Sequence, residues 1–241
     1  MSAPNCDDPH NPGAIDIDSA HARIAAAIEP VTGGARVGLR DALGRVLAED
    51  LHTSFDIPPD TNAAMDGYAV RGADLDSSGH AELAMVGTAW AGHPLDRRIG
   101  AGECARIMTG APVPAGTDTV VMQERTRTDG ATIAIDGGEP GSNVRAAGED
   151  LPAGGLALES GARIRPAELG VIASLGLTSV PVRRRPRVAL FATGDELFEP
   201  GQKLKPGGLY DSNRYTVWGM LTRLGMEIDD RGHLPDDRAA V

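Results

Sequence analysis

Acidic residues in unusual surroundings are the first candidates for chemistry in this sequence. Asp66 stands in AMDGYA, among apolar residues and directly before Gly67. Three further acids stand shortly after a glycine or an apolar run: Asp150 in AAGED, Glu196 in ATGDEL and Asp236 in LPDD. Two or more such carboxylates would suit a hard cation such as Mg²⁺, which keeps several waters and bridges to substrate phosphates.

Each of these acids also has a purely structural interpretation, because Asp and Glu after Gly often form turns or helix caps. Glu196 follows an apolar run that is predicted to be a strand, and ligands of open α/β sheets bind beyond the carboxyl ends of strands. Thr109 lies in IMTGAPVP, which alone is consistent with a proline-stiffened turn. The glycine pairs fit no nucleotide-binding fingerprint, and the six histidines have no ligand spacing and join no assignable Ser-His-Asp set.

Composition and charge exclude several kinds of partner. The 241 residues carry a net charge of -11, so the chain should repel nucleic acid and anionic membranes. An anionic substrate would therefore need a local positive site or a divalent cation. The two cysteines, Cys6 and Cys104, form no disulfide framework and no Cys-rich metal site, and unpaired thiols are typical of a reducing cytoplasm. The sequence has no transmembrane run and no signal peptide pattern.

The elements that must position these residues begin with a polar, Pro-rich tail at 1–13, which is expected to be disordered. Residues 14–54 then predict helices. Asp18 or Ser19 can cap the first helix, which carries an apolar i,i+4 pair. A second short helix is expected in RDALGRVLAED.

Residues 143–183 contain a further predicted helix in RPAELGVIASLGL. Pro166 suits its first turn, and Gly176 is a natural C-cap. Its expected apolar face consists of Leu169, Ile172 and Ala173. If the segments 14–54 and 143–183 pack together as one domain, the chain between them is an insertion.

That insertion, residues 55–142, alternates short apolar runs with Gly, Pro and Asp, and it predicts a small β-barrel or sandwich. Residues 184–241 instead predict an α/β pattern: the strand RVALFATG, the helix DSNRYTVWGMLTRLG, the strand MEIDDRGHL and a first helical turn in PDDRAAV. This order favours parallel pairing of the two strands. Two strands cannot complete a covered parallel sheet, so the chain is expected to stop inside this domain.

Five strings of the sequence carry a resemblance to a known family: AMDGYAV, IMTGAPVPAGTDTVVMQE, VRAAGED, VALFATGDEL and YDSNRYTVWGMLTRLG. In this order, over residues 14–241, they resemble the molybdopterin molybdenumtransferases (MoeA type, similar to the gephyrin E domain). The resemblance implies an α+β multidomain fold. A split helical domain (14–54 and 143–183) holds an inserted, barrel-like β-domain (55–142), and the start of an α/β molybdopterin-binding domain follows (184–241).

The resemblance also implies an activity. Family members insert molybdate into adenylylated molybdopterin, with Mg²⁺-dependent release of AMP, as cytoplasmic homodimers. A molybdopterin adenylyltransferase upstream is the further partner that this activity implies. The Ser/Gly-rich loop after the third α/β strand, the lysines that follow it and the final β-barrel of the family are absent from the sequence. The chain is therefore expected to be a C-terminally truncated member.

Five residues match functional positions of the family: Asp66, Thr109, Asp150, Glu196 and Asp236. The resemblance assigns Mg²⁺ and phosphate handling to the acids, with Asp66 and Glu196 as metal ligands, and hydrogen bonding to an oxyanion to Thr109. In the family dimer, the acid matched by Asp66 faces the α/β domain of the other subunit. A non-catalytic dimerisation or scaffold module, or a molybdate-binding protein without catalysis, remains the alternative.

Overall fold

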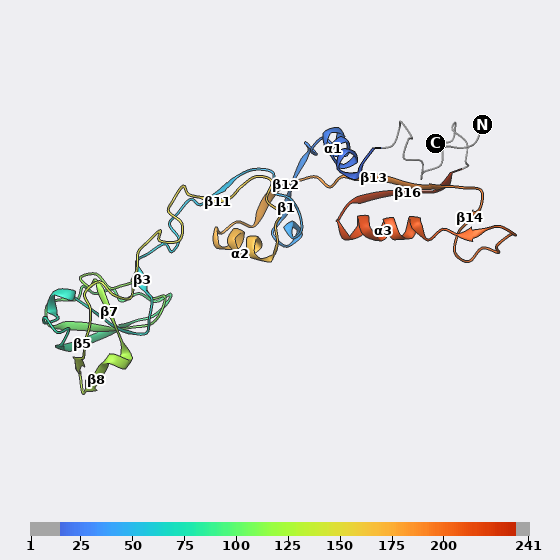
Figure 1. Cartoon of the computed structure of the whole chain (residues 1–241). Coiled ribbons are helices and arrows are strands. Elements are labelled where there is room, and N and C mark those ends of the chain that lie inside the picture. The colour runs from blue at the N-terminus through green and yellow to red at the C-terminus, as the bar shows by residue number, and fades with distance from the viewer. Residues whose placement is uncertain (1–14, 235–241) are drawn as a thin grey trace. The chain divides into compact units, whose positions relative to one another are not determined.

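The computed structural model describes residues 15–234 (Figure 1). The chain forms two compact units, one from the described residues of 1–48, 163–169 and 178–241 and the other from residues 49–162 and 170–177. The expected tail at 1–13, the helical turn expected in PDDRAAV, and Asp236 lie outside the described residues. No helix within residues 15–234 is both long and apolar enough to cross a membrane.

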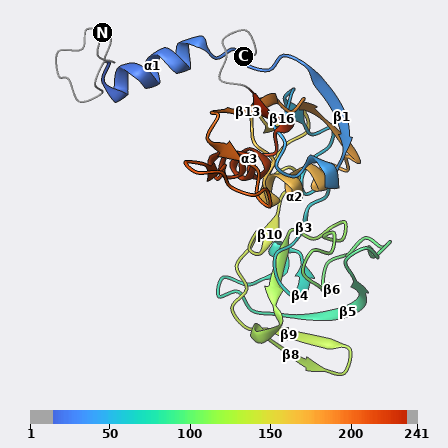
Figure 2. The same ribbon diagram turned by 90° about the vertical axis from the view of Figure 1, so that its right-hand side faces the viewer.

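A six-stranded sheet dominates the second unit, and Figure 2 shows several of its strands together. Its strands run in the order β7-β4-β6-β5-β9-β8, and every pair is antiparallel except β5 with β6. The strand bounds are β4 (Gly67–Val70), β5 (Ala81–Ala89), β6 (Glu103–Ile107), β7 (Thr119–Met122), β8 (Thr126–Asp129) and β9 (Thr132–Ile135). The short apolar runs of residues 55–142 are therefore strands, as the sequence predicts.

Strand β4 is buried on both faces, which explains its uninterrupted apolar sequence. Tyr68 and Val70 pack in one hydrophobic cluster with Val121, and Ala69 packs in another with Val120. Neighbouring residues of a strand point to opposite faces, so β4 and β7 contribute to two cores at once. The cores are mainly aliphatic, in keeping with an aromatic content of 3%.

Short two-stranded ribbons flank this sheet in the same unit. One ribbon pairs β2 (Leu51–His52) with β11 (Leu156–Leu158), and another pairs β3 (Asn62–Ala63) with β10 (Val144–Arg145). Two 3₁₀ turns, η2 (Gly72–Asp74) and η3 (Gln123–Arg125), follow β4 and β7. The chain thus enters and leaves the sheet through paired antiparallel segments.

In the first unit, β1 (Gly34–Gly38) pairs antiparallel with β12 (Ser179–Arg183). The helix expected in RDALGRVLAED is wrong: only the 3₁₀ turn η1 (Arg40–Ala42) forms. Gly44 then takes a left-handed conformation with φ 77, and Val46 and Leu47 form β-bridges. Long-range pairing outweighs local helix propensity at this place.

Two helices belong to the flanking segments. Helix α1 (Ile17–Ala27) begins two or three residues earlier than expected, because the cap is Asp16, whose side chain accepts from the Ser19 backbone N–H at 2.8 Å. Helix α2 (Pro166–Ser174) starts at the expected proline and crosses from one unit into the other. Its expected apolar face is partly wrong, since Ile172 is buried but Ala173 is exposed.

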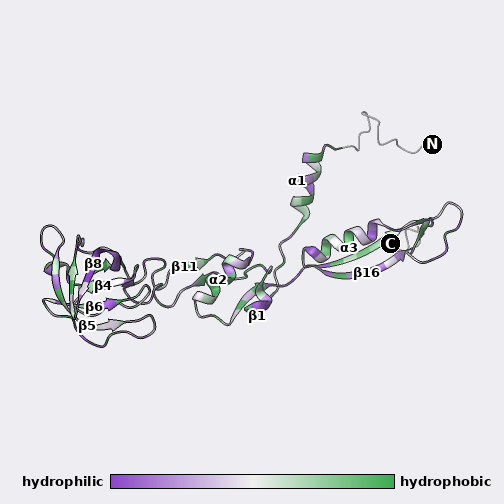
Figure 3. Cartoon of the chain, turned by 90° about the horizontal axis from the view of Figure 1, so that it is seen from below, coloured by the Kyte–Doolittle hydropathy of each residue, from purple (hydrophilic) through white to green (hydrophobic). Residues whose placement is uncertain are grey.

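The α/β segment follows its predicted order. Strand β13 (Arg187–Thr193) pairs in parallel with β16 (Glu227–Leu234). Between them lie β14 (Leu197–Phe198), β15 (Leu209–Tyr210) and α3 (Asn213–Arg223), which mixes hydrophobic and hydrophilic residues (Figure 3). The predicted parallel pairing is therefore confirmed.

The division into three domains stays a prediction. The segments 14–54 and 143–183 contain two α-helices but also the strands β1, β2, β10, β11 and β12. The expectation that these segments are mainly helical is therefore wrong, because paired strands hold them together as much as helices do.

Candidate functional site

A close approach between two paired strands fixes the backbone beside Asp66. Gly67 pairs with Ile107 of β6 on one side and with Met122 of β7 on the other. A Cβ atom on this glycine would lie 2.0 Å from the Val121 carbonyl oxygen. Only glycine allows β4 to lie so close to β7, and Asp66 directly precedes this glycine.

The Asp66 carboxylate is anchored through a single oxygen atom. Its Oδ1 accepts from the Thr109 backbone N–H at 2.7 Å and from the Thr109 hydroxyl at 2.6 Å. The hydroxyl and backbone hydrogen bonds from Thr109 lower the pKa of Asp66, with a smaller contribution from the charge of Arg106. Asp66 is therefore ionised at neutral pH, and among residues 15–234 no hydrogen bond to its Oδ2 is found.

Two residues that the sequence analysis missed complete this site. Arg106 lies on β6, with its guanidinium 5.0 Å from the centre of the Tyr68 ring, and it donates to the Gln123 side-chain oxygen. Gln123 also donates its backbone N–H to the Asp66 carbonyl at 3.1 Å. Arg106 begins the string RIMTG, which contains Thr109, and Gln123 lies in VVMQE, directly after β7. Their closeness in sequence to Thr109 and β7 was the available signal that they belong to the site.

This site combines an exposed carboxylate, a hydroxyl, an amide and a guanidinium within one sheet unit. Such a set can provide one oxygen ligand to a hard cation and can attract a phosphate or another oxyanion. We call Asp66, Arg106, Thr109 and Gln123 the Asp66 site.

Asp150 belongs to the same unit but has a partner of its own. Arg145 of β10 donates to the Asp150 Oδ1 at 2.6 Å and to the Glu149 Oε1 at 3.3 Å. The hydrogen bond to Asp150, followed by that to Glu149, raises the pKa of Arg145. Within the described residues, no hydrogen bond or ion pair joins Asp150 to the Asp66 site. Arg145 thus forms exposed ion pairs with both acids.

Glu196 lies in the other unit, just beyond the carboxyl end of β13, as the sequence predicts. Gly194 takes φ 142, and a Cβ atom there would lie 2.9 Å from the Glu196 Oε2. The glycine therefore leaves room for the carboxylate to fold back over the turn. The Glu196 carbonyl accepts from the Leu209 N–H at 2.9 Å, which ties the turn to β15.

A buried charge cluster in the α/β segment was not predicted. Arg214 donates to both carboxylate oxygens of Asp230 at 2.7 Å, to Asp211 at 3.1 Å and to Glu199. His233 lies 3.0 Å from the same Asp211 oxygen. Burial opposes the ionisation of Asp211, but hydrogen bonds from Arg214 and His233 outweigh it and lower its pKa. This cluster holds α3 against β16.

The sheet unit supplies one of the two expected metal ligands, Asp66. Across the described residues, no three His, Cys, Asp or Glu side chains gather in the manner of a metal site. Asp66 fits Mg²⁺ as one carboxylate ligand, because Mg²⁺ commonly takes one or two carboxylates together with waters and substrate phosphates. Glu196, the other expected ligand, belongs to the other unit.

The geometry and the fold define a protein with a carboxylate-bearing β-sheet unit and a parallel α/β segment, and comparison with known proteins places this architecture in a family. Residues 15–176 match the family described as the MoeA N-terminal region (domain I and II). The chain belongs to this MoeA family.

Two bacterial relatives are both named molybdopterin molybdenumtransferase, one of them with the number 2. The chain is 38% identical over 227 residues to the molybdopterin molybdenumtransferase of Haemophilus influenzae, covering 93% of this chain and 56% of that protein. It is 38% identical over 234 residues to molybdopterin molybdenumtransferase 2 of Mycobacterium tuberculosis, covering 91% and 55%. The chain thus spans about half the length of these relatives.

A solved structure has the same fold. The crystal structure of the molybdopterin biosynthesis moeA protein from Pyrococcus horikoshii OT3 superposes with a TM-score of 0.86 at 33% identity. The match covers 93% of this chain and 61% of that one. The arrangement of elements described above is therefore that of the MoeA fold.

Proposed function

We propose that this chain takes part in molybdenum cofactor biosynthesis. In this proposal it belongs to an enzyme that inserts molybdate into adenylylated molybdopterin and releases AMP with the help of Mg²⁺. Membership of the MoeA family and the names of the relatives support the pathway. The observation that carries the chemistry is the ionised Asp66, anchored through one oxygen by Thr109.

Each residue of the Asp66 site has a role in the proposed reaction. Mg²⁺, when bound, would neutralise phosphate charge and polarise a phosphoryl oxygen. Asp66 would hold the cation through Oδ2, while Thr109 keeps the carboxylate in a fixed orientation. The Arg106 guanidinium supplies positive charge that attracts the adenylate phosphate in an otherwise acidic protein.

The remaining matched acids complete the proposal. Glu196 would be a second Mg²⁺ ligand, and Asp150 and Asp236 would take part in phosphate handling. Substrate binding would require an assembled site, for which we propose a cytoplasmic homodimer supplied by a molybdopterin adenylyltransferase. Helix α1 supports assembly, because it has no buried residue and leaves Ile17 74% and Ile24 57% exposed.

The test measures AMP release from adenylylated molybdopterin in the presence of Mg²⁺ and molybdate. Because the chain spans about half of its relatives, the assay uses the chain fused to the remaining C-terminal part of the Haemophilus influenzae relative. Asp66→Asn removes the charge at nearly constant shape and should slow release about 10²-fold or more, as the loss of one electrostatic catalytic group does.

Asp76→Asn is the matched control. Asp76 lies in the same unit, is exposed, and also accepts two backbone hydrogen bonds that lower its pKa. It should keep the parent rate. Equal AMP release by the Asp66 variant and the parent, with unchanged thermal melting, would refute the catalytic role and favour the scaffold alternative.

A further inference from the structure

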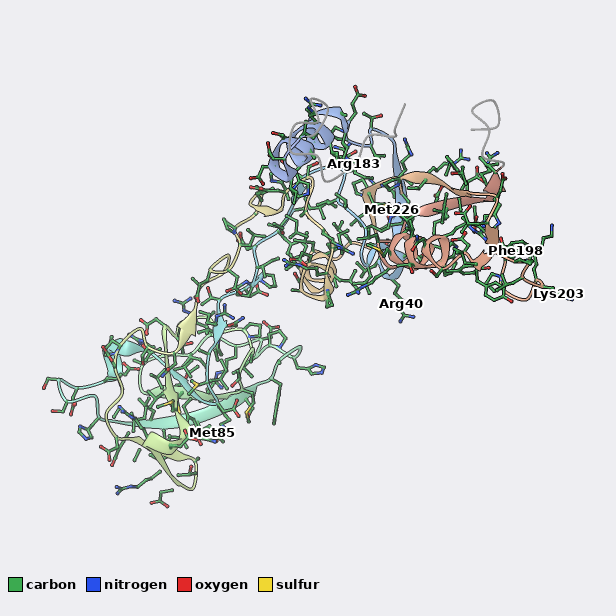
Figure 4. The ribbon with its side chains drawn as sticks, turned by 45° about the vertical axis from the view of Figure 1, so that its right-hand side comes forward. Arg40, Met85, Arg183, Phe198, Lys203 and Met226 are labelled. Carbon is green, nitrogen blue, oxygen red and sulfur yellow. The ribbon has the colours of Figure 1, made fainter. Side chains whose placement is uncertain are left out.

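A cavity of about 420 Å³ lies in the first unit, apart from every residue of the Asp66 site. Six of its thirteen lining residues are arginines, and none is an acid. The arginines are Arg45, Arg163, Arg183, Arg184, Arg185 and Arg223. Figure 4 labels Arg183 and Met226, which both line it.

The concentration of positive charge is unusual for this chain. The whole sequence has 23 basic residues against 34 acidic ones, and six of the 23 meet at this cavity. A run such as Arg183–Arg185 is commonly a solvated basic surface. Here, however, this run is joined by arginines from two other places in the sequence and from the end of α3.

Carboxylates do not neutralise these arginines. Other arginines of the described chain form ion pairs, as Arg145 does with Asp150 and Arg214 does with Asp230. Throughout residues 15–234, no carboxylate lies within ion-pair distance of any of the six lining arginines. Like charges that are held together repel one another, and an anion in the cavity would relieve that repulsion.

The end of α3 accounts for only one of the six. Helix C-termini carry partial negative charge, and a basic residue in the last turn offsets it. Arg223 takes that position. The other five arginines lie outside α3 and have no such role.

Hydrogen bonds hold one wall of the cavity in place before any ligand arrives. The Arg183 N–H donates to the Val46 carbonyl at 2.7 Å, and the Arg45 guanidinium donates to the Arg183 carbonyl at 2.8 Å. The Glu227 N–H donates to the Pro186 carbonyl at 2.9 Å, within the α/β segment. A preorganised wall reduces the entropy that a ligand must overcome on binding.

We propose that this cavity binds a compact anion that carries one or more phosphate groups. Planar guanidinium groups match phosphate oxygens in a bidentate geometry, and several of them together can bind more than one phosphate. The volume falls within the usual range for small-molecule sites. The net charge of -11 argues against a nucleic acid as the occupant.

The test is isothermal titration calorimetry of the chain with inorganic phosphate and with pyrophosphate. The double variant Arg163→Gln/Arg185→Gln removes two exposed lining charges whose side chains donate no hydrogen bond to the described residues. Pyrophosphate should bind the parent at one saturable site and bind this variant at least about tenfold more weakly, which corresponds to about 1.4 kcal/mol. Tighter binding of pyrophosphate than of phosphate would identify a ligand with several phosphates, and the reverse would identify a single phosphate group.

A matched control is the double variant Arg36→Gln/Arg40→Gln. It removes the same charge from the same unit, and neither residue lines the cavity (Figure 4 labels Arg40). It should bind pyrophosphate as the parent does. The double variant Arg163→Lys/Arg185→Lys keeps the charge and should fall between the parent and the glutamine variant, because lysine lacks the bidentate fork.

Three results would overturn the proposal. These are the absence of saturable binding of either anion to the parent, equal weakening in the two glutamine variants, and unchanged binding in Arg163→Gln/Arg185→Gln. Circular dichroism melting establishes that each variant is folded. Should the glutamine variant fail to fold, the lysine variant decides by the same comparison with the control.

Discussion

Replacing Arg214 tests how the α/β segment is held together. Arg214→Met keeps much of the side-chain volume but removes the guanidinium that joins Asp211, Asp230 and Glu199. The three carboxylates would then face one another without their common cation. We expect the segment to lose stability, with helix α3 separating from β16.

The size of the effect follows from the exposure of each carboxylate. The side chains of Asp230 and Glu199 are 34% and 32% exposed, so water can replace the lost hydrogen bonds. The Asp211 side chain is only 2% exposed, so its carboxylate remains buried. Removing one partner from a buried ion pair costs about 3–5 kcal/mol, and we expect about 3 kcal/mol because His233 still contacts Asp211.

Urea unfolding followed by tryptophan fluorescence measures this change. The chain has two tryptophans, Trp90 after β5 and Trp218 on α3, so a Trp90→Phe background reports on the α/β segment. With a slope of about 2 kcal/mol per molar urea, the midpoint should fall by about 1.5 M. Asp230→Asn, which affects a half-exposed partner, should lower the free energy of unfolding by about 1 kcal/mol only.

The result that would refute this reasoning is specific. If Arg214→Met changed the free energy of unfolding by less than that of Asp230→Asn, the buried Asp211 would not depend on Arg214. The cluster would then be incidental to the packing of α3. A change in the Trp90 signal of equal size, measured in a Trp218→Phe background, would instead show that the substitution acts on the whole chain.

Three further predictions concern single residues. Gly67→Ala would place a Cβ atom 2.0 Å from the Val121 oxygen, so it should lower the melting temperature of the sheet unit by roughly 10 °C or more, measured by circular dichroism. Hydrogen bonding to Arg165 lowers the pKa of Glu168 to about 2, so Glu168 contributes stability above its ordinary pKa of 4.5 that is lost as pH falls toward 2; nuclear magnetic resonance titration of Arg165→Gln should show its pKa return toward 4.5. Burial raises the pKa of Cys104 to about 11, so in a Cys6→Ser background its thiol should resist a disulfide reagent at pH 8 until the chain unfolds.

Each of these predictions has a clear contrary outcome. A Gly67→Ala protein that melts with the parent would mean that β4 can shift away from β7. A Glu168 pKa that is unchanged when Arg165 is removed would assign the shift to backbone hydrogen bonds. Rapid labelling of Cys104 in folded protein would mean that the β6 core opens locally.

Sequence patterns predicted the strands of the β-sheet unit because their period reflects burial. In β4, apolar residues occupy every position, and the structure buries both faces of the strand. The helix expected in RDALGRVLAED does not form, because its local pattern did not reflect its burial and pairing in the fold. Local propensity favoured a helix, but pairing with β12, more than 130 residues later, determined the conformation.

In the candidate site, too, local sequence predicted some features, while others depend on tertiary packing. Asp66 and Thr109 could be singled out by their neighbours, but nothing local shows that residues 43 positions apart share two hydrogen bonds. The Arg214 cluster was missed because DSNRYT resembles an ordinary helix start, and Asp211 does accept the N–H of Arg214 in that role. That the same arginine also bridges Asp230 depends on tertiary packing. The gathering of the six arginines around one cavity likewise arises only on folding.

The pairing of β1 with β12 has a consequence for synthesis on the ribosome. Arg36 of β1 and Ser179 of β12 are 143 residues apart. At elongation rates of about 5–20 residues per second, β1 waits roughly 7–30 s for its partner strand to emerge. The intervening β-sheet unit can fold completely in that interval, while β1 remains an unpaired strand. On a polysome, a β1 strand that is still waiting can pair with β12 of the adjacent nascent chain, so slower translation of codons 49–162 would favour strand-exchanged pairs.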